Sequence, residues 1–170
     1  MGIWDARNDE ERDHWRFIPL VSVGPLRFGM RCDEVVDVLD PSRPGVFTVG
    51  SGLPACAEIP FAHLGVNTYY ENGLLYCVAI DALTGPQVTL NDETLVGRVP
   101  SEVEQWACDH AKTHGLELRY THAADPELAD LGLIIRAQRA GDVVLSRPVF
   151  LQERAKVTWD YVPTSEWSYF

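Results

Sequence analysis

The residues most suited to metal chemistry lie in one short segment. His110 and His114 are four residues apart, and Cys108 lies two residues before the first of them. On a helix this spacing places two imidazoles on one face, where they can share a metal ion. The chain has no HExxH motif, and a third ligand such as His122 or Asp125 would have to come from a loop. We therefore interpret the pair as helix-surface residues and predict neither a metal nor a cofactor.

Other residues with catalytic side chains lack the neighbours that catalysis requires. Gly50-Ser51-Gly52 does not have the GxSxG frame of a nucleophile elbow and is interpreted as a loop. Asp33 and Glu34 are adjacent on a predicted helix, so their side chains diverge and do not form a general acid–base pair. The helix dipole accounts for negative charge at this position. The sequence contains no Walker A and no GxGxxG motif. These observations favour a binding protein over an enzyme.

The charge of the chain restricts its partners. Its 170 residues include 25 acidic and 14 basic side chains, which gives a net charge of −11. This balance argues against nucleic acid, because phosphate binding requires clustered Lys and Arg. It suits a basic protein partner, although it also serves solubility alone. No apolar run reaches the roughly 18 residues of a membrane helix, and the N-terminus lacks the apolar segment of a secretion signal. We therefore expect a cytoplasmic protein without a membrane contact, as a monomer or homodimer.

The cysteines are Cys32, Cys56, Cys77 and Cys108, and they form no CxxC motif. In the cytoplasm they are predicted to be reduced and mostly buried. In a secreted protein, four cysteines allow three sets of pairs. A Cys56–Cys77 disulfide would then be favoured, because both residues lie in strand-like segments.

Periodicity and turn signals predict two helices and two β-hairpins. The helices are expected at residues 32–39 and 100–114. The hairpins are expected to join strands 66–71 and 74–81 through Asn72-Gly73, and strands 133–139 and 142–150 through Ala140-Gly141. An Asn-Gly pair is a strong hairpin signal, because both turn positions need a positive φ. Further strands are predicted at 17–23, 46–49, 87–90, 116–121 and 156–161, with a loop or short turn at 125–130.

One offset relates the two halves of the chain. A separation of 68 positions joins four pairs of landmarks: Gly29 and Gly97, Glu34 and Glu102, Gly73 and Gly141, and the strands at 88–90 and 156–161. This spacing indicates a tandem duplication, and the alternative is two unrelated α+β segments of similar length. We predict an α+β fold in which a helix and three or four antiparallel strands occur twice, with the helices packed on one face of the sheet. The predicted parts are an extension (1–16), two repeats (17–91 and 92–161) and an aromatic tail (162–170).

A helix followed by antiparallel strands, twice in a chain of this length, resembles the β-lactamase inhibitory proteins. Gly29-Met30 with Val35 is similar to the Gly-Met-x-x-x-x-Val start of a helix in small outer-membrane assembly lipoproteins, which share that half-fold. The resemblance covers roughly residues 20–161 and implies a concave sheet that grips a protein. The sequence departs from both families, because it lacks a secretion signal and a lipidation cysteine near its N-terminus. We therefore transfer neither β-lactamase as the target nor any inhibitor residue.

Alternation in the hairpin strands predicts which side chains face a partner. The faces with Cys77 and Ala79, and with Ala137 and Val144, are assigned to the helices. The opposite face is predicted to be open, with partner-binding residues Tyr69, Glu71, Tyr76, Arg136, Gln138 and Arg147. Tyr and Arg are enriched in binding hot spots, whereas the other interpretation has the tyrosines capping the edge of the core. The assignment needs a one-residue register change between the two copies, which a bulge could supply.

The sequence therefore predicts a protein-binding module, either an inhibitor or an immunity-type protein, with a basic toxin or enzyme as its partner. The alternative is a small-ligand-binding protein or an enzyme that uses the cleft between the two repeats.

Overall fold

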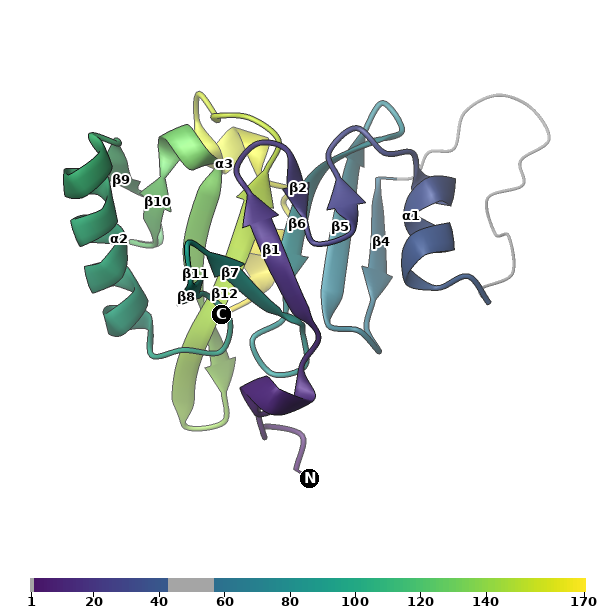
Figure 1. The fold of residues 1–170 in the computed structure, drawn as a ribbon, viewed down its shortest axis with the longest axis horizontal. Helices are drawn as coiled ribbons and strands as arrows, with labels where there is room; N and C mark the ends of the chain where they lie inside the picture. Colours follow the sequence, from purple (N-terminus) through teal and green to yellow (C-terminus); the bar gives the residue numbers. More distant parts are fainter. Residues whose placement is uncertain (1, 43–56) are drawn as a thin grey trace.

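The computed structural model describes residues 2–42 and 57–170, and it shows a mixed α+β fold with two sheets (Figure 1). The small sheet has the order β3-β2-β1-β7-β8. Its strands are β1 (His14–Ile18), β2 (Ser22–Val23), β3 (Leu26–Arg27), β7 (Gln87–Leu90) and β8 (Glu93–Thr94). The large sheet has the order β4-β5-β6-β12-β11-β10-β9. Its strands are β4 (Glu58–Phe61), β5 (Val66–Glu71), β6 (Leu74–Ile80), β9 (Leu118–Tyr120), β10 (Pro126–Leu128), β11 (Leu133–Ala140) and β12 (Val143–Leu151).

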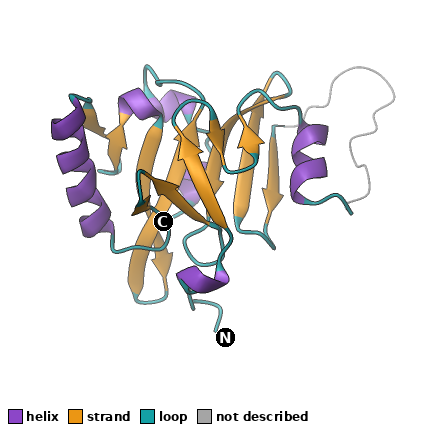
Figure 2. Cartoon of the chain, in the orientation of Figure 1, coloured by secondary structure: helices purple, strands orange, loops and turns teal. Residues whose placement is uncertain are grey.

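The two longer helices lie where the sequence predicts them, and a third, short helix lies near the C-terminus. The helices and turns are named below in chain order. They are α1 (Cys32–Leu39), α2 (Pro100–His114) and the short α3 (Thr158–Tyr161), with 3-10 turns η1 (Asp9–Glu11), η2 (Ala129–Leu131) and η3 (Glu166–Ser168) (Figure 2). At the start of α1, the Glu34 carboxylate accepts a hydrogen bond from the Arg31 backbone N–H at 2.8 Å. Pro100 opens α2, and Gly115 ends it with a φ of 65°. Pro at the first position and Gly just past the end are the expected boundary residues of a helix.

Both hairpins form, but the second turn lies one residue later than predicted. Asn72 and Gly73 have φ values of 53° and 78°, as the Asn-Gly signal requires. In the second hairpin Ala140 pairs with Val143, so the turn is Gly141-Asp142 rather than Ala140-Gly141. Gly141 has a φ of 65° and takes the first turn position, which is where a type II′ turn places glycine.

Three further predictions about elements are wrong. The segment predicted as a strand at 156–161 contains the helix α3, although its residues are β-rich. The Thr158 hydroxyl donates to the Glu127 carboxylate at 2.6 Å, a tertiary contact that local propensity does not reveal. The loop or short turn predicted at 125–130 begins instead with β10, which starts at Pro126, a position where strands tolerate proline. The turn η2 follows it from Ala129. The first strand begins at His14, inside the predicted extension. The predicted strand at 46–49 lies outside the described residues.

The two faces of the large sheet contact different parts of the chain. The main core cluster contains residues of the large sheet and the small sheet, together with buried residues of the two longer helices such as Val35 and Val103. In Figure 1, α1 and α2 lie towards opposite ends of the large sheet, with β1 between them. The other face forms a second cluster that includes Ala155 and Val162 from the C-terminal segment, which we define as residues 155–170. We call this second surface the tail-side face.

A bulge in the first hairpin changes which residues lie on the tail-side face. Tyr69 pairs with Cys77 and Tyr70 pairs with Leu75, so Tyr76 is an extra residue on β6. Cys77 and Ala79 therefore share the tail-side cluster with Tyr69. Their predicted assignment to the helix side is wrong.

Candidate functional site

Four of the predicted partner-binding residues come together on the tail-side face. Tyr69 lies on β5, Arg136 and Gln138 lie on β11, and Arg147 lies on β12. Arg136 is the direct cross-strand partner of Arg147. The Arg147 guanidinium donates to the Gln138 amide oxygen at 3.0 Å. The sequence-derived faces of the second hairpin are therefore confirmed for these residues.

This part of the face is closed by the chain itself, which contradicts the predicted open surface. Glu166 of the C-terminal segment has a relative exposure of 0%, and its carboxylate accepts from Arg147 Nε at 2.6 Å and from Nη2 at 3.1 Å. The Tyr69 hydroxyl donates to the same carboxylate at 2.7 Å, and Arg136 donates to the Glu166 backbone carbonyl at 2.6 Å. One glutamate thus joins three of the four predicted residues.

Two aromatic residues of the C-terminal segment cover the arginines. The Tyr169 ring lies 3.8 Å from the Arg147 guanidinium carbon, and the Trp167 ring lies 4.9 Å from that of Arg136. Such stacking over guanidinium groups is favourable, most of all where water is excluded. Asn67 also donates to the Tyr169 hydroxyl at 3.0 Å. The rings therefore shield both arginines from solvent.

We call Tyr69, Arg136, Gln138 and Arg147, together with the residues of the C-terminal segment that cover them, the closed region. Two aspartates complete its ion pairs. Asp81 lies 3.7 Å from Arg147 and accepts from the Gln138 amide at 2.8 Å. Asp125 accepts from Arg136 Nε at 3.2 Å. Every arginine and glutamine on this part of the face consequently has a partner in the chain, as buried charges require.

Burial and the ion pairs shift the pKa values of this region. Burial next to the Glu166 carboxylate raises the pKa of Tyr69, so its hydroxyl stays protonated and can donate. Burial opposes the charge of Arg147, but the hydrogen bond and charge of Glu166 outweigh it and raise the Arg147 pKa. Burial also opposes the charge of Asp81, while hydrogen bonds from Gln138 and the backbone lower its pKa overall. Arg147 and Asp81 are therefore held in their charged forms, and Tyr69 is held in its neutral form.

The other two predicted residues, Glu71 and Tyr76, remain accessible at the edge of the tail-side face. Glu71 is exposed and Tyr76 is partly exposed. The Tyr76 ring meets the Tyr161 ring edge-on, with centroids 5.4 Å apart. The Tyr161 hydroxyl donates to Glu153 at 3.3 Å, and burial raises the pKa of Tyr161 to about 12. We call these four residues the exposed patch: Glu71, Tyr76, Glu153 and Tyr161.

The residues considered for metal or nucleophilic chemistry do not form a site in the described chain. The His110 and His114 rings lie 4.1 Å apart, and the Trp106 ring stacks on His110. Within residues 2–42 and 57–170, no group of His, Cys, Asp and Glu side chains is arranged to hold a metal ion. Gly50-Ser51-Gly52 lies outside the described residues.

Three of the four cysteines lie in the described ranges. Cys32 and Cys77 are buried, and Cys108 is partly buried. Burial raises the pKa of the Cys77 thiol. Cys56, the suggested disulfide partner of Cys77, lies outside the described residues.

Sequence reasoning missed the residues that close the tail-side face. They are Asp81, Asp125, Glu166, Trp167 and Tyr169. The tail was recognised as aromatic, and its one glutamate among aromatic residues was the available signal for a buried ion pair. Alternation places Arg147 on a face, but it does not reveal which distant segment covers that face.

Comparisons with protein-family models, with curated proteins and with solved structures found no match to this chain. In the part of the chain that the structure describes, no helix is long and apolar enough to cross a bilayer.

Proposed function

We propose that this chain is a protein-binding module, an inhibitor or immunity-type protein that acts by stoichiometric binding to a basic protein. The observation that carries the proposal is the exposed patch, where two tyrosine rings and two carboxylates lie together on an acidic chain. Two of its members, Glu71 and Tyr76, were selected from the sequence for the same role.

The patch has the chemistry to receive Lys or Arg side chains of a partner. An aromatic face attracts a cation, and a neighbouring carboxylate adds a charge-assisted hydrogen bond. Tyrosine is also enriched among residues that dominate binding energy. The net charge of −11 would speed the encounter with a basic partner.

The tandem duplication and the likeness to β-lactamase inhibitory proteins belong to the same proposal. The paired glycines have similar geometry, with φ values of 91° for Gly29 and 68° for Gly97. The two hairpins meet at the centre of the large sheet, where β6 pairs with β12. The segment at 156–161 departs from the pattern because it is helical. We further propose that the protein acts in the cytoplasm, where free thiols such as Cys77 stay reduced.

The proposal is tested by capture with matched variants. The immobilised full chain is incubated with extract of the producing cells, and the retained proteins are quantified. Three baits are compared: wild type, Glu71→Lys and Asp37→Lys. Asp37 is an exposed residue of α1, whose buried residues belong to the main core cluster and not to the cluster of the tail-side face. Both variants change the charge equally.

We expect wild type and Asp37→Lys to retain one basic protein in stoichiometric amount, and Glu71→Lys to lose it. Added salt should weaken retention, because exposed charges are screened. Equal retention by all three baits, or equal loss with both variants, would contradict binding through the exposed patch.

A further inference from the structure

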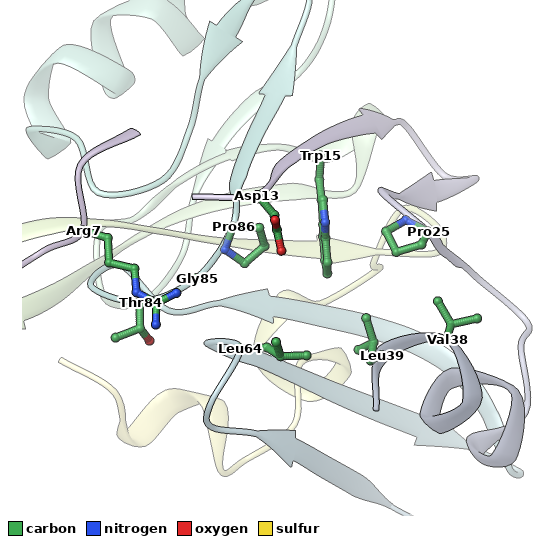
Figure 3. A pocket seen from close by; sticks show the side chains of 10 residues that line it. All are labelled: Arg7, Asp13, Trp15, Pro25, Val38, Leu39, Leu64, Thr84, Gly85 and Pro86. Atoms are coloured by element: carbon green, nitrogen blue, oxygen red, sulfur yellow. The ribbon is translucent and has the colours of Figure 1, made fainter. Parts of the chain in front are cut away.

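A cavity of about 210 Å³ lies between the end of α1, β1 and the turn at 84–86 (Figure 3), and no residue of the exposed patch lines it. Its apolar lining consists of Trp15, Pro25, Val38, Leu39, Leu64 and Pro86. Sites for drug-sized ligands are larger, roughly 300–1,000 Å³. The cavity therefore suits a molecule with few heavy atoms.

The indole of Trp15 is fixed in place before any ligand arrives. Gly24 has a φ of 56°, and a Cβ on it would lie 2.5 Å from Cγ and Cδ2 of Trp15. The Gly24 N–H donates to the Arg16 carbonyl at 2.8 Å, which holds this backbone against the ring. One side of the indole thus packs on glycine. A preformed wall of this kind lowers the entropic cost of binding.

The opposite wall depends on a close approach of two glycines. A Cβ on Gly65 would lie 2.4 Å from the Gly85 backbone nitrogen. The Gly85 N–H donates to the Asp81 carbonyl at 3.0 Å, and the Asp81 N–H donates to the Gly65 carbonyl at 2.9 Å. This contact fixes Leu64 relative to the turn that carries Thr84 and Pro86.

Two charged side chains of opposite sign, Asp13 and Arg7, also line the cavity. In the view of Figure 3, Asp13 lies beside Trp15 and Pro86, whereas Arg7 lies near Thr84. Their backbones are fixed, because the Arg7 N–H donates to Leu83 O at 2.9 Å and the Asp13 carbonyl accepts from Gln87 at 2.8 Å.

Within residues 2–42 and 57–170, neither the Asp13 carboxylate nor the Arg7 guanidinium has an ion pair or a hydrogen bond. Other charged side chains nearby do have such partners. Arg12 donates to the backbone carbonyls of Gly85 and Ala82 at 2.6 and 2.9 Å, and Arg98 pairs with Asp9 at 2.5 Å. The cavity therefore offers one carboxylate and one guanidinium beside an apolar surface.

We propose that this cavity binds a small amphoteric molecule with an apolar body, of the class of amino acids with an aliphatic side chain. The ammonium group binds Asp13, the carboxylate binds Arg7, and the aliphatic part packs against Trp15 and Leu64. The site is separate from the exposed patch and does not depend on the protein partner. The cavity is lined by the predicted extension and the first predicted repeat, so it is a different site from the cleft between the two repeats that the sequence suggested for a small ligand.

The test uses the isotope-labelled full chain and follows the indole N–H signal of Trp15 by NMR, assigned with Trp15→Phe. The probes are L-leucine, N-acetyl-L-leucine, which lacks the ammonium group, L-leucinamide, which lacks the carboxylate, and glycine, which lacks the aliphatic part. We expect L-leucine to shift the Trp15 signal saturably with a Kd of about 1 mM or tighter. Each of the other probes should bind roughly tenfold more weakly, because it lacks one of the three contacts, with Asp13, with Arg7 or with the apolar lining.

Matched variants separate the site from a general charge effect. Asp13→Asn and Arg7→Gln should each weaken L-leucine binding at least roughly tenfold. Asp37→Asn and Arg16→Gln remove the same charges from exposed positions outside the cavity and should bind as wild type does. The proposal is overturned if no probe shifts Trp15, or if both control variants lose binding as well. Equal binding of L-leucine and L-leucinamide would also overturn it, because the site would then take a cation alone.

Discussion

The closed region around Arg147 and the exposed patch around Tyr76 lie on the same face of one sheet, yet they meet different surroundings. Arg147 has a relative exposure of 1% and is bound by Glu166, Gln138 and the ring of Tyr169. Glu71 is exposed, and Tyr76 contacts Tyr161 at the edge of the C-terminal segment. Residue type alone does not distinguish a binding surface from a buried network, because Tyr and Arg occur in both. The path of the C-terminal segment makes the difference.

The largest expected effect is on the closed region. Glu166→Gln removes the charged partner closest to the buried Arg147 and leaves only Asp81, 3.7 Å away, so the free energy of unfolding should fall by about 3–5 kcal/mol. Glu153→Gln, a change of the same kind in the exposed patch, should alter it by less than about 0.5 kcal/mol. Urea unfolding of both variants measures the difference. If both variants lost less than about 0.5 kcal/mol, the C-terminal segment would not close this part of the face.

The second largest expected effect is the loss of stability when the hydroxyl of Tyr69 is removed, compared with the same change at Tyr76 on the neighbouring strand. Tyr69→Phe removes the hydroxyl that donates to Glu166 at 2.7 Å, and we expect a loss of about 1–2 kcal/mol in the free energy of unfolding. Tyr76→Phe should cost less than about 0.5 kcal/mol, because its hydroxyl has no hydrogen-bond partner among the described residues. If the two variants were equally stable, the hydrogen bond to Glu166 would not contribute.

The contribution of Asp81 to the free energy of unfolding should depend on pH, unlike that of an exposed aspartate. Its pKa in the folded chain lies below the value of about 3.9 expected when unfolded, so the charged carboxylate stabilises the fold above about pH 4. That contribution is lost as the pH falls through the folded pKa. The stability difference between wild type and Asp81→Asn should therefore shrink on acidification below pH 4, as urea unfolding in a pH series would reveal. Asp37→Asn serves as the control, and a difference for Asp81→Asn that does not change with pH would be inconsistent with this role.

The smallest expected effect on stability is in the exposed patch. Glu71→Lys should change the free energy of unfolding by less than about 0.5 kcal/mol, because the side chain is exposed. The same variant should lose the protein partner. Thermal unfolding alongside the capture experiment would separate the two outcomes. A large loss of stability would place Glu71 in the closed network instead.

The sequence was sufficient where structure is local. The bounds of α1 and α2 follow from boundary residues such as Pro100 and Gly115, and the first hairpin follows from Asn72-Gly73. The side chains of the second hairpin were placed on the correct faces because β11 and β12 pair without a bulge. Such features depend on residues a few positions apart.

Non-local features were missed. The extra residue at Tyr76 moves Cys77 to the other face, and no residue type marks a bulge there. α3 forms in a β-rich segment because Thr158 contacts Glu127, a residue of β10. The closure of the face depends on Glu166, which is 19 positions from Arg147. Alternation shows which residues share a face, but not whether solvent or another segment covers them.

The most direct test of the closed region is a double-mutant cycle on Arg147 and Glu166. Urea unfolding of wild type, Arg147→Met, Glu166→Gln and the double variant gives the coupling between the two side chains. The structure predicts that the second change costs much less once the first is present, with a coupling of about 2–3 kcal/mol in the free energy of unfolding. Additive losses, within about 0.5 kcal/mol, would contradict the account, because the two residues would then not act as a buried pair.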